Sequence, residues 1–178
     1  MIEDIKVLKN PKTQLYLNVK RMILSEHFSW FWQKTTIVED EKIDEKKYHN
    51  ISCYSHTFLM RPEENKKYSS PSSNYLDEVS EVFKEILDHN NIRINTFIRM
   101  NANCTHQYSK VLNCIPHTDH EFPHNNIIMY LSDSGGSTIV NSHEYSPSED
   151  DVILFGGERH YYQTPRHGRR VVLVATFL

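Results

Sequence analysis

Short β-prone segments separated by turn signals fill the chain from residue 92 to the C-terminus, and this pattern limits the possible fold more than any other feature. Gly135-Gly136 and Gly156-Gly157 mark two of the turns. Many short strands at close spacing predict a β-sandwich or a jelly roll. The segments are residues 92–100, 111–115, 126–132, 137–140, 151–155, 161–164 and 170–177.

The first half of the chain contains two amphipathic helices. Apolar residues fall on one helical face between Leu15 and Ile23, and again across residues 76–90, where Glu and Lys occupy the other face. Residues 5–8 and 51–59 can form strands. We expect the helices to cover one sheet and to leave the mouth between two sheets for a functional site.

Aromatic residues gather in residues 28–32, and β-branched residues follow at 35–37. This composition predicts a strand over the core, with lining of a substrate groove as the alternative. The charged stretch 39–50 and the Ser- and Pro-rich stretch 61–74 predict loops. These loops could fold over a substrate or remain solvated.

The chain has 178 residues and no visible domain boundary, so we expect a single domain over residues 1–178. Residues 1–91 would support a jelly-roll core formed by residues 92–178. The fold class is therefore mainly β with flanking helices.

Charge and composition restrict the partners. A net charge of −3 and a pI near 6.4 give no electrostatic footprint for nucleic acid, although charge alone does not exclude it. No apolar run is long enough to span a membrane, and the acidic N-terminus lacks a secretory h-region. Cys53, Cys104 and Cys114 form no CxxC motif, so we interpret them as reduced thiols of a cytoplasmic protein.

A candidate metal site is formed by His117, Asp119 and His160. The first two are two residues apart at the end of a predicted strand, so their side chains should point to the same face. His160 would come from a distant strand. Two histidines and one carboxylate on one face of a metal are characteristic of non-haem Fe(II) oxygenases, because they leave positions open for a cosubstrate and O₂.

Two other interpretations of these residues remain. A His-x-Asp pattern arises easily by chance in a chain with 11 histidines, so the residues could be surface or capping groups. A zinc hydrolase could use the same ligands, but it would need a general base such as the Glu of His-Glu-x-x-His, and this motif is absent from the sequence.

Several longer stretches of the C-terminal half also point to an oxygenase with this type of metal site. They are His117-Thr118-Asp119, Met129-Tyr130-Leu131-Ser132, Gly135-Gly136-Ser137-Thr138, Asp151-Val152-Ile153-Leu154-Phe155, His160 and Gly168-Arg169-Arg170-Val171-Val172-Leu173. In these stretches, their order and their spacing, the chain resembles the Fe(II)- and 2-oxoglutarate-dependent oxygenases, and within them the prolyl-4-hydroxylase-like group. The resemblance covers residues 99–178 and, more loosely, the helix at 76–90. It implies a double-stranded β-helix, which is a jelly roll.

The resemblance also implies roles for individual residues. His117, Asp119 and His160 would bind Fe(II). Arg170 would form a salt bridge with the far carboxylate of 2-oxoglutarate, while the adjacent Arg169 would point to the other face of the strand.

Three further residues would contact the cosubstrate if the resemblance holds. Tyr130 and Thr138 would assist the carboxylate held by the arginine, and Tyr108 would contact 2-oxoglutarate nearer the metal. Each of the three could instead be a packing residue.

The sequence departs from the family pattern at Ser132, where Asn is usual, and at Thr164, where proline often occurs. The loop at residues 120–125 is short. The small size of the chain and its segments 28–32 and 56–59 resemble short members encoded by bacteriophages, which would place the protein in the host cytoplasm.

The function expected from the resemblance is dioxygenase activity on a C–H bond of a protein or peptide, with a prolyl residue as one candidate. Fe(II) would be the cofactor, 2-oxoglutarate and O₂ the cosubstrates, and succinate and CO₂ the coproducts; ascorbate could stimulate turnover. Alternatives are hydroxylation of a free amino acid or small metabolite, and nucleic-acid demethylation. Such demethylases typically carry a second arginine six residues after the first, where this chain has Thr176. A β-sandwich binding module with a vestigial metal site is the non-enzyme alternative.

Overall fold

An eight-stranded antiparallel sheet is the largest element of the computed structural model, which describes residues 5–35, 44, 46–62 and 68–178. Strand β5 (Ser70–Pro71) pairs with β4 outside the main path of this sheet. The order along that path is β1 (Lys6–Leu8), β11 (Val152–Gly156), β8 (Asn125–Tyr130), β13 (Arg169–Phe177), β6 (Phe97–His106), β4 (Cys53–Met60) and β2 (Phe31–Gln33).

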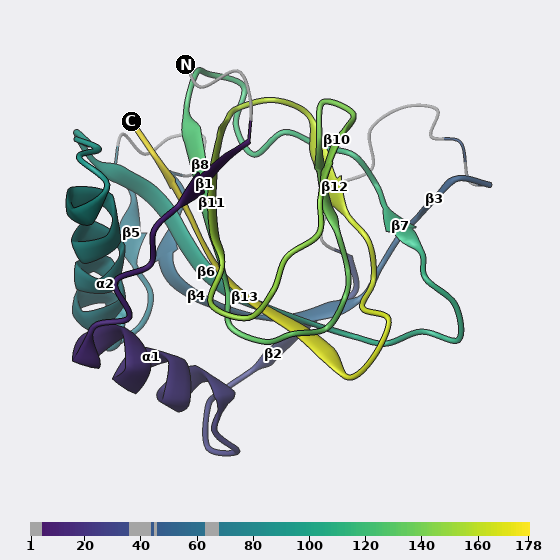
Figure 1. Ribbon diagram of the computed structural model, residues 1–178, viewed down its shortest axis with the longest axis horizontal. Coiled ribbons are helices and arrows are strands. Elements are labelled where there is room, and N and C mark those ends of the chain that lie inside the picture. Colours follow the sequence, from purple (N-terminus) through teal and green to yellow (C-terminus); the bar gives the residue numbers. More distant parts are fainter. Residues whose placement is uncertain (1–4, 36–43, 45, 63–67) are drawn as a thin grey trace.

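Two smaller sheets lie opposite this main sheet (Figure 1). One has the order β10 (His143–Tyr145), β9 (Thr138–Val140) and β12 (His160–Tyr162). The other pairs β3 (Tyr48–His49) with β7 (Asn113–Cys114) in parallel. Main and smaller sheets together form the two walls of a jelly roll.

Both helices pack on the side of the main sheet that faces away from the smaller sheets (Figure 1). Helix α1 (Gln14–Leu24) begins after Thr13, whose Oγ1 accepts a hydrogen bond from the Tyr16 N–H at 3.1 Å. Helix α2 (Leu76–His89) buries one apolar stripe, as its periodicity predicts. The buried residues of this stripe are Val79, Val82, Phe83, Ile86 and Leu87.

Alternation along the central strands separates two cores. In β8, Ile127 and Met129 pack in the core under the helices, whereas Ile128 and Tyr130 pack in a smaller core inside the jelly roll. Side chains of β13 alternate in the same way, so its even-numbered residues face the interior between the sheets and its odd-numbered residues from 171 to 177 face the helices. This alternation decides which side chains can reach a site there.

The expected fold class is confirmed: the protein is mainly β with flanking helices, and these cover one sheet. Neither described helix combines the length and apolar character needed to cross a membrane. The N-terminal half does more than support the core, because its strands β1, β2 and β4 belong to the main sheet.

Several boundaries differ from expectation. The predicted strand at 92–100 is instead β6 at Phe97–His106, and β10 was not predicted. The predicted strand at 28–32 is reduced to β2, whose residues are all exposed because it is the edge strand of the sheet. Parts of the predicted strand 35–37 and of the predicted loops 39–50 and 61–74 lie outside the described residues.

Candidate metal centre and cosubstrate cavity

A cavity of about 800 Å³ lies between the main sheet and the smaller sheets. Two adjacent strands, β6 and β13, form its floor with side chains at every second position. Cross-strand register pairs these lining residues as Thr105 with Arg170, Asn103 with Val172, Asn101 with Val174 and Arg99 with Thr176. The floor therefore has an arginine at each end, Arg170 on β13 and Arg99 on β6.

The predicted metal-ligand set comes together on the wall of this cavity. His117, Asp119 and His160 each offer a ligand atom, and these atoms lie within 4.8 Å of one another. The expected strand geometry for the first two is wrong, since residue 117 forms only an isolated β-bridge and residue 119 lies in a bend. The bend, rather than strand alternation, brings the carboxylate beside the imidazoles.

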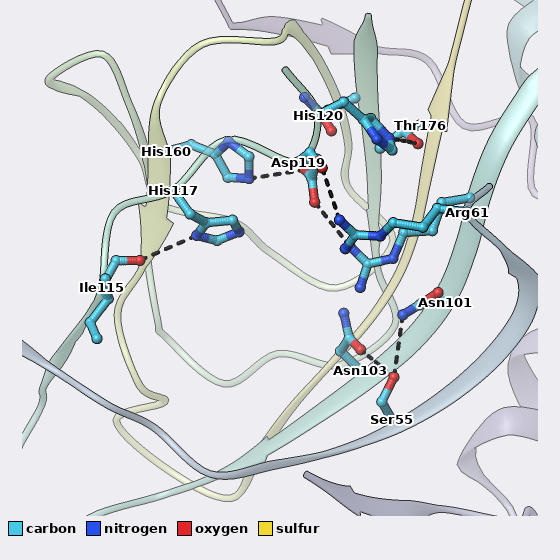
Figure 2. Close-up of polar contacts among 12 residues, drawn as sticks. Ser55, Arg61, Asn101, Asn103, Ile115, His117, Asp119, His120, His160 and Thr176 are labelled. Carbon is cyan, nitrogen blue, oxygen red and sulfur yellow. Dashed lines mark hydrogen bonds and ion pairs between the residues drawn. The ribbon is translucent and has the colours of Figure 1, made fainter. Parts of the chain in front are cut away.

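Backbone carbonyls fix the orientation of both histidines. The Nδ1 of His117 lies 3.2 Å from the Ile115 carbonyl oxygen (Figure 2). The Nδ1 of His160 lies 2.9 Å from the Glu158 carbonyl oxygen. A carbonyl oxygen can only accept, so each Nδ1 carries the proton and each Nε2 keeps a free lone pair. Burial lowers the pKa of His117 to about 4, which keeps this ring neutral at physiological pH.

The two oxygens of the Asp119 carboxylate contact different side chains. Oδ2 faces the Nε2 of His160 at 3.5 Å, and Oδ1 accepts from Nη1 of Arg99 at 3.0 Å. Burial alone would raise the pKa of Asp119, but the neighbouring His160 ring and the Arg99 guanidinium lower it more, which holds the carboxyl ionised. Two imidazoles and one carboxylate fit a divalent metal with the ligand preferences of Fe(II).

Arg170 lies in the interior with 5% of its surface exposed. Its Nη2 donates to Thr138 Oγ1 at 3.1 Å, and the same oxygen accepts from the Tyr130 hydroxyl at 2.7 Å. The Arg170 Nε is buried without a hydrogen bond, and no ion pair joins this guanidinium to an acid of the described chain. An unpaired buried cation of this kind fits a carboxylate ligand.

Adjacent Arg169 points the other way, as strand alternation predicts. It is exposed, and its Nη2 donates to the Leu24 carbonyl oxygen at 3.3 Å on the helix side. The structure thus brings Arg170, Tyr130 and Thr138 together and keeps Arg169 out of the cavity.

Tyr108 does not join this group. It follows the end of β6 and its hydroxyl lies 3.2 Å from Ser52 Oγ, and it is not among the residues that line the cavity. A strand that runs to residue 106 instead presents Asn103 and Thr105 to the interior. The prediction for Tyr108 rested on its position nine residues before His117, which matches a tyrosine of the resembled family, and the structure places this side chain outside the cavity lining.

Three cavity residues were not predicted. Tyr162 packs its ring 4.8 Å from the Arg170 guanidinium and accepts from Thr105 Oγ1 at 3.2 Å, and burial raises its pKa. Arg99 contacts the Asp119 carboxylate, and Arg61 donates to the Asp119 carbonyl oxygen at 3.1 Å. For Arg99 the available signal was the polar-apolar alternation of residues 99–105, in which every second side chain is polar.

The sequence matches no protein-family model and no curated protein. Solved structures do match. One is a 2OG-Fe(II) oxygenase family oxidoreductase from Burkholderia pseudomallei, with 15% identity and a TM-score of 0.58 over 71% of this chain. The chain spans 66% of that protein's length.

Two further structures align over nearly the whole chain. A prolyl hydroxylase from Trichoplax adhaerens, in complex with a hypoxia inducible factor peptide fragment, has 13% identity and a TM-score of 0.62 over 98% of this chain and 83% of its own. The α-ketoglutarate-dependent epimerase SnoN from nogalamycin biosynthesis has 10% identity and a TM-score of 0.58 over 99% and 78%. At these identities the likeness concerns architecture, and the chain has the jelly-roll fold of the 2OG-Fe(II) oxygenases.

Proposed function

We propose that this protein is an Fe(II)- and 2-oxoglutarate-dependent dioxygenase that hydroxylates a C–H bond of a protein or peptide. One observation carries the proposal. The same cavity contains two imidazoles with free Nε2 atoms, an ionised carboxylate beside them and a buried arginine that lacks an acidic partner. Residues that served only as surface groups or as core packing would have no reason to combine these three features in one cavity.

Each group would have a defined task. His117, Asp119 and His160 would hold Fe(II), and Arg170 would bind the far carboxylate of 2-oxoglutarate. Thr138 accepts two hydrogen bonds, so its own hydroxyl proton is free to donate to that carboxylate. The bound metal and cosubstrate would supply the oxidation, with O₂ consumed and succinate and CO₂ released.

The peptide substrate is supported by the architecture of one structural neighbour, which is a prolyl hydroxylase crystallised with a peptide. We therefore propose a prolyl residue as the first candidate target. A free amino acid, a small metabolite or a nucleic acid remains an alternative substrate. One observation favours the nucleic-acid alternative. Nucleic-acid demethylases carry a second arginine at the position of Thr176, and in this protein Arg99 of the neighbouring strand β6 pairs with Thr176.

The three cysteines are buried thiols that form no disulfide with one another. Burial raises the pKa of Cys53 to about 11, so its reactive thiolate form is disfavoured. These thiols support our expectation that the protein works in a reducing compartment such as the cytoplasm. A bacteriophage source, with action in the host cytoplasm, stays part of the proposal.

The test is succinate formation from 2-oxoglutarate by purified protein with Fe(II), O₂ and ascorbate. Asp119→Ala should abolish turnover, whereas the matched variant Asp133→Ala, at an exposed position away from the cavity, should retain it. Prolyl peptides and the same peptides with alanine are then compared for stimulation. Equal turnover by Asp119→Ala would refute the metal assignment, and stimulation by a nucleic acid alone would refute the peptide substrate.

If neither Fe(II) nor 2-oxoglutarate binds at all, the binding-module alternative is correct. Direct binding measurements therefore accompany the turnover assay, because a tightly coupled oxygenase can be silent without its substrate.

A further inference from the structure

A second pair of cationic side chains faces the cavity beside the metal-ligand set. Arg99 reaches the carboxylate of Asp119, with Nη1 3.0 Å from Oδ1. Arg61 reaches the backbone oxygen of the same residue at 3.1 Å (Figure 2). Both guanidinium groups line the cavity. The proposed oxygenase chemistry assigns no ligand to either of them.

This pair lies at the far end of the cavity floor from Arg170. On the paired strands β6 and β13, Arg99 stands opposite Thr176 whereas Arg170 stands opposite Thr105. These two positions are six residue steps apart along each strand, which is roughly 20 Å of backbone at the usual rise per residue. The Arg61–Arg99 end is therefore a separate part of the cavity from the pocket around Arg170.

The charges of the cavity are unbalanced. Its described lining includes Arg61, Arg99, Arg159 and Arg170 but a single acidic residue, Asp119, and no lysine or glutamate. If Asp119 binds a metal, much of its negative charge is used there. Arg61 and Arg99 would then face a single carboxylate that also binds the metal, which leaves an excess of positive charge in a partly enclosed site.

The other polar side chains that β4 and β6 present to the cavity are uncharged. Ser55 lies across the ladder from Asn103, and its hydroxyl donates to the Asn103 Oδ1 at 2.8 Å; Asn101 is the next lining residue on β6 (Figure 2). These groups can accept or donate hydrogen bonds but cannot neutralise a guanidinium. A ligand that binds here must bring the negative charge itself.

We propose that Arg61 and Arg99 bind a carboxylate of the substrate, beside the carbon that reacts. The inference rests on the proposed function and specifies the substrate class for the same site. A carboxylate fits because a guanidinium can hold it through two parallel hydrogen bonds, and Arg99 already holds the Asp119 carboxylate. Only Nη1 of Arg61 is engaged with the described residues, so its other N–H groups can bind a ligand. The carboxylate comes from an acidic side chain of a peptide or from a free amino acid.

The test is calorimetric titration of paired probes into the full-length protein saturated with Mn(II) and 2-oxoglutarate, which occupy the metal and Arg170 sites. One pair is N-acetyl-glutamate amide and N-acetyl-glutamine amide, which reports a side-chain carboxylate in a peptide. The other is free L-proline and L-prolinamide, which reports a free α-carboxylate. Proteins carrying Arg61→Gln and, as a matched control, Arg21→Gln on the exposed side of α1 are titrated in parallel.

The carboxylate-bearing member of at least one pair should bind about tenfold to a hundredfold more tightly than its amide partner. Arg61→Gln should remove this preference without changing Mn(II) or 2-oxoglutarate affinity, and Arg21→Gln should preserve it. Removing Mn(II) should weaken carboxylate binding, since Asp119 then competes for Arg99.

Equal binding within both pairs, no binding of any carboxylate, or a preference that survives Arg61→Gln would overturn the inference. If Mn(II) and 2-oxoglutarate bind normally in that case, the proposed function stands and only the substrate class is wrong. Failure of Mn(II) or 2-oxoglutarate to bind would instead contradict the proposed function.

Discussion

His117 and His160 are partners in an antiparallel β-bridge, in which the backbone N–H of each donates to the carbonyl oxygen of the other at 2.9 Å. The bridge ties the segment after β7 to the start of β12. It fixes the separation of two imidazoles that are distant in sequence, with ring centroids 4.6 Å apart, before any metal binds. The candidate site is thus built by backbone pairing, which favours a preorganised metal centre.

Replacing Arg170 by Met should weaken 2-oxoglutarate binding to the Mn(II)-loaded protein by about tenfold to a hundredfold, because a charge-assisted pair is lost. Metal affinity should not change. The neighbouring variant Arg169→Met removes the same charge from the exposed face of β13 and should bind 2-oxoglutarate normally. Calorimetry measures both affinities, and a comparable loss in Arg169→Met would show that the wrong arginine was assigned.

Thr138→Val should weaken 2-oxoglutarate binding by roughly threefold to tenfold, the effect of losing neutral hydrogen bonds. The substitution removes the oxygen that accepts from both Tyr130 and Arg170, while it keeps the side-chain volume nearly constant. Tyr108→Phe serves as the comparison, because the Tyr108 hydroxyl contacts Ser52 and not the cavity. A larger loss in Tyr108→Phe than in Thr138→Val would support the original sequence-based role of that tyrosine.

Arg99→Met should weaken Mn(II) binding by about tenfold to a hundredfold, since groups that orient a metal ligand typically have effects of this size. Arg99 holds Oδ1 of Asp119 and leaves Oδ2 toward the metal side. Arg61→Gln should not weaken the metal, because Arg61 contacts only the Asp119 backbone and its removal lessens repulsion of the cation. Tighter metal binding by Arg99→Met would mean that the Arg99 charge repels the metal more strongly than its hydrogen bond to Asp119 helps to position the carboxylate.

Asp150→Asn should lower the free energy of unfolding by about 1–3 kcal/mol at pH 7. The Asp150 carboxylate accepts from the Tyr16 hydroxyl at 2.6 Å and pairs with Lys20 and Lys12, so it joins α1 to the strand core. Asn tolerates the positive φ of 70° at this position, so the variant tests the charge. Glu149→Gln, at an exposed ion pair with Lys20, should change stability much less.

The effect of Asp150→Asn should also depend on pH. Burial alone would raise the pKa of Asp150, but the hydrogen bonds from Lys20 and Tyr16 lower it to about 2. The unfolded value is about 3.9, so the carboxylate stabilises the protein above that pH and loses this contribution as the pH falls toward 2. Urea unfolding of both proteins between pH 7 and pH 3 measures this effect, and the difference between their free energies of unfolding should become smaller as the pH falls. A difference that grows on acidification would contradict the assignment.

The parts of the fold with long or strict periodicity were predictable. Helix α2 matches the stripe at residues 76–90 to within one residue, because a long amphipathic pattern has no good alternative structure. The opposite directions of Arg169 and Arg170 followed from strand alternation alone.

What the sequence could not specify depends on pairing between distant segments. Strand β6 extends past its apolar start because β13 supplies partners from Phe97 to His106 and β4 supplies them from Met100 to Cys104. Tyr108 follows the end of this strand and does not line the cavity. The contacts of Arg61 and Arg99 with Asp119 join three separate segments, so local pattern gave no sign of them. Strand β10 was missed because its exposed, polar residues lack the apolar alternation of the others.

The most direct test of the central claim, that one cavity binds a metal and 2-oxoglutarate together, is calorimetric titration of 2-oxoglutarate into the protein with and without Mn(II), beside Asp119→Ala. We predict one metal ion per chain, and 2-oxoglutarate binding that is at least about tenfold tighter with metal, a coupling of ordinary size for linked sites. Asp119→Ala should fold normally but lose both the metal and this coupling. Metal-independent 2-oxoglutarate binding, or unchanged metal affinity in Asp119→Ala, would contradict the account.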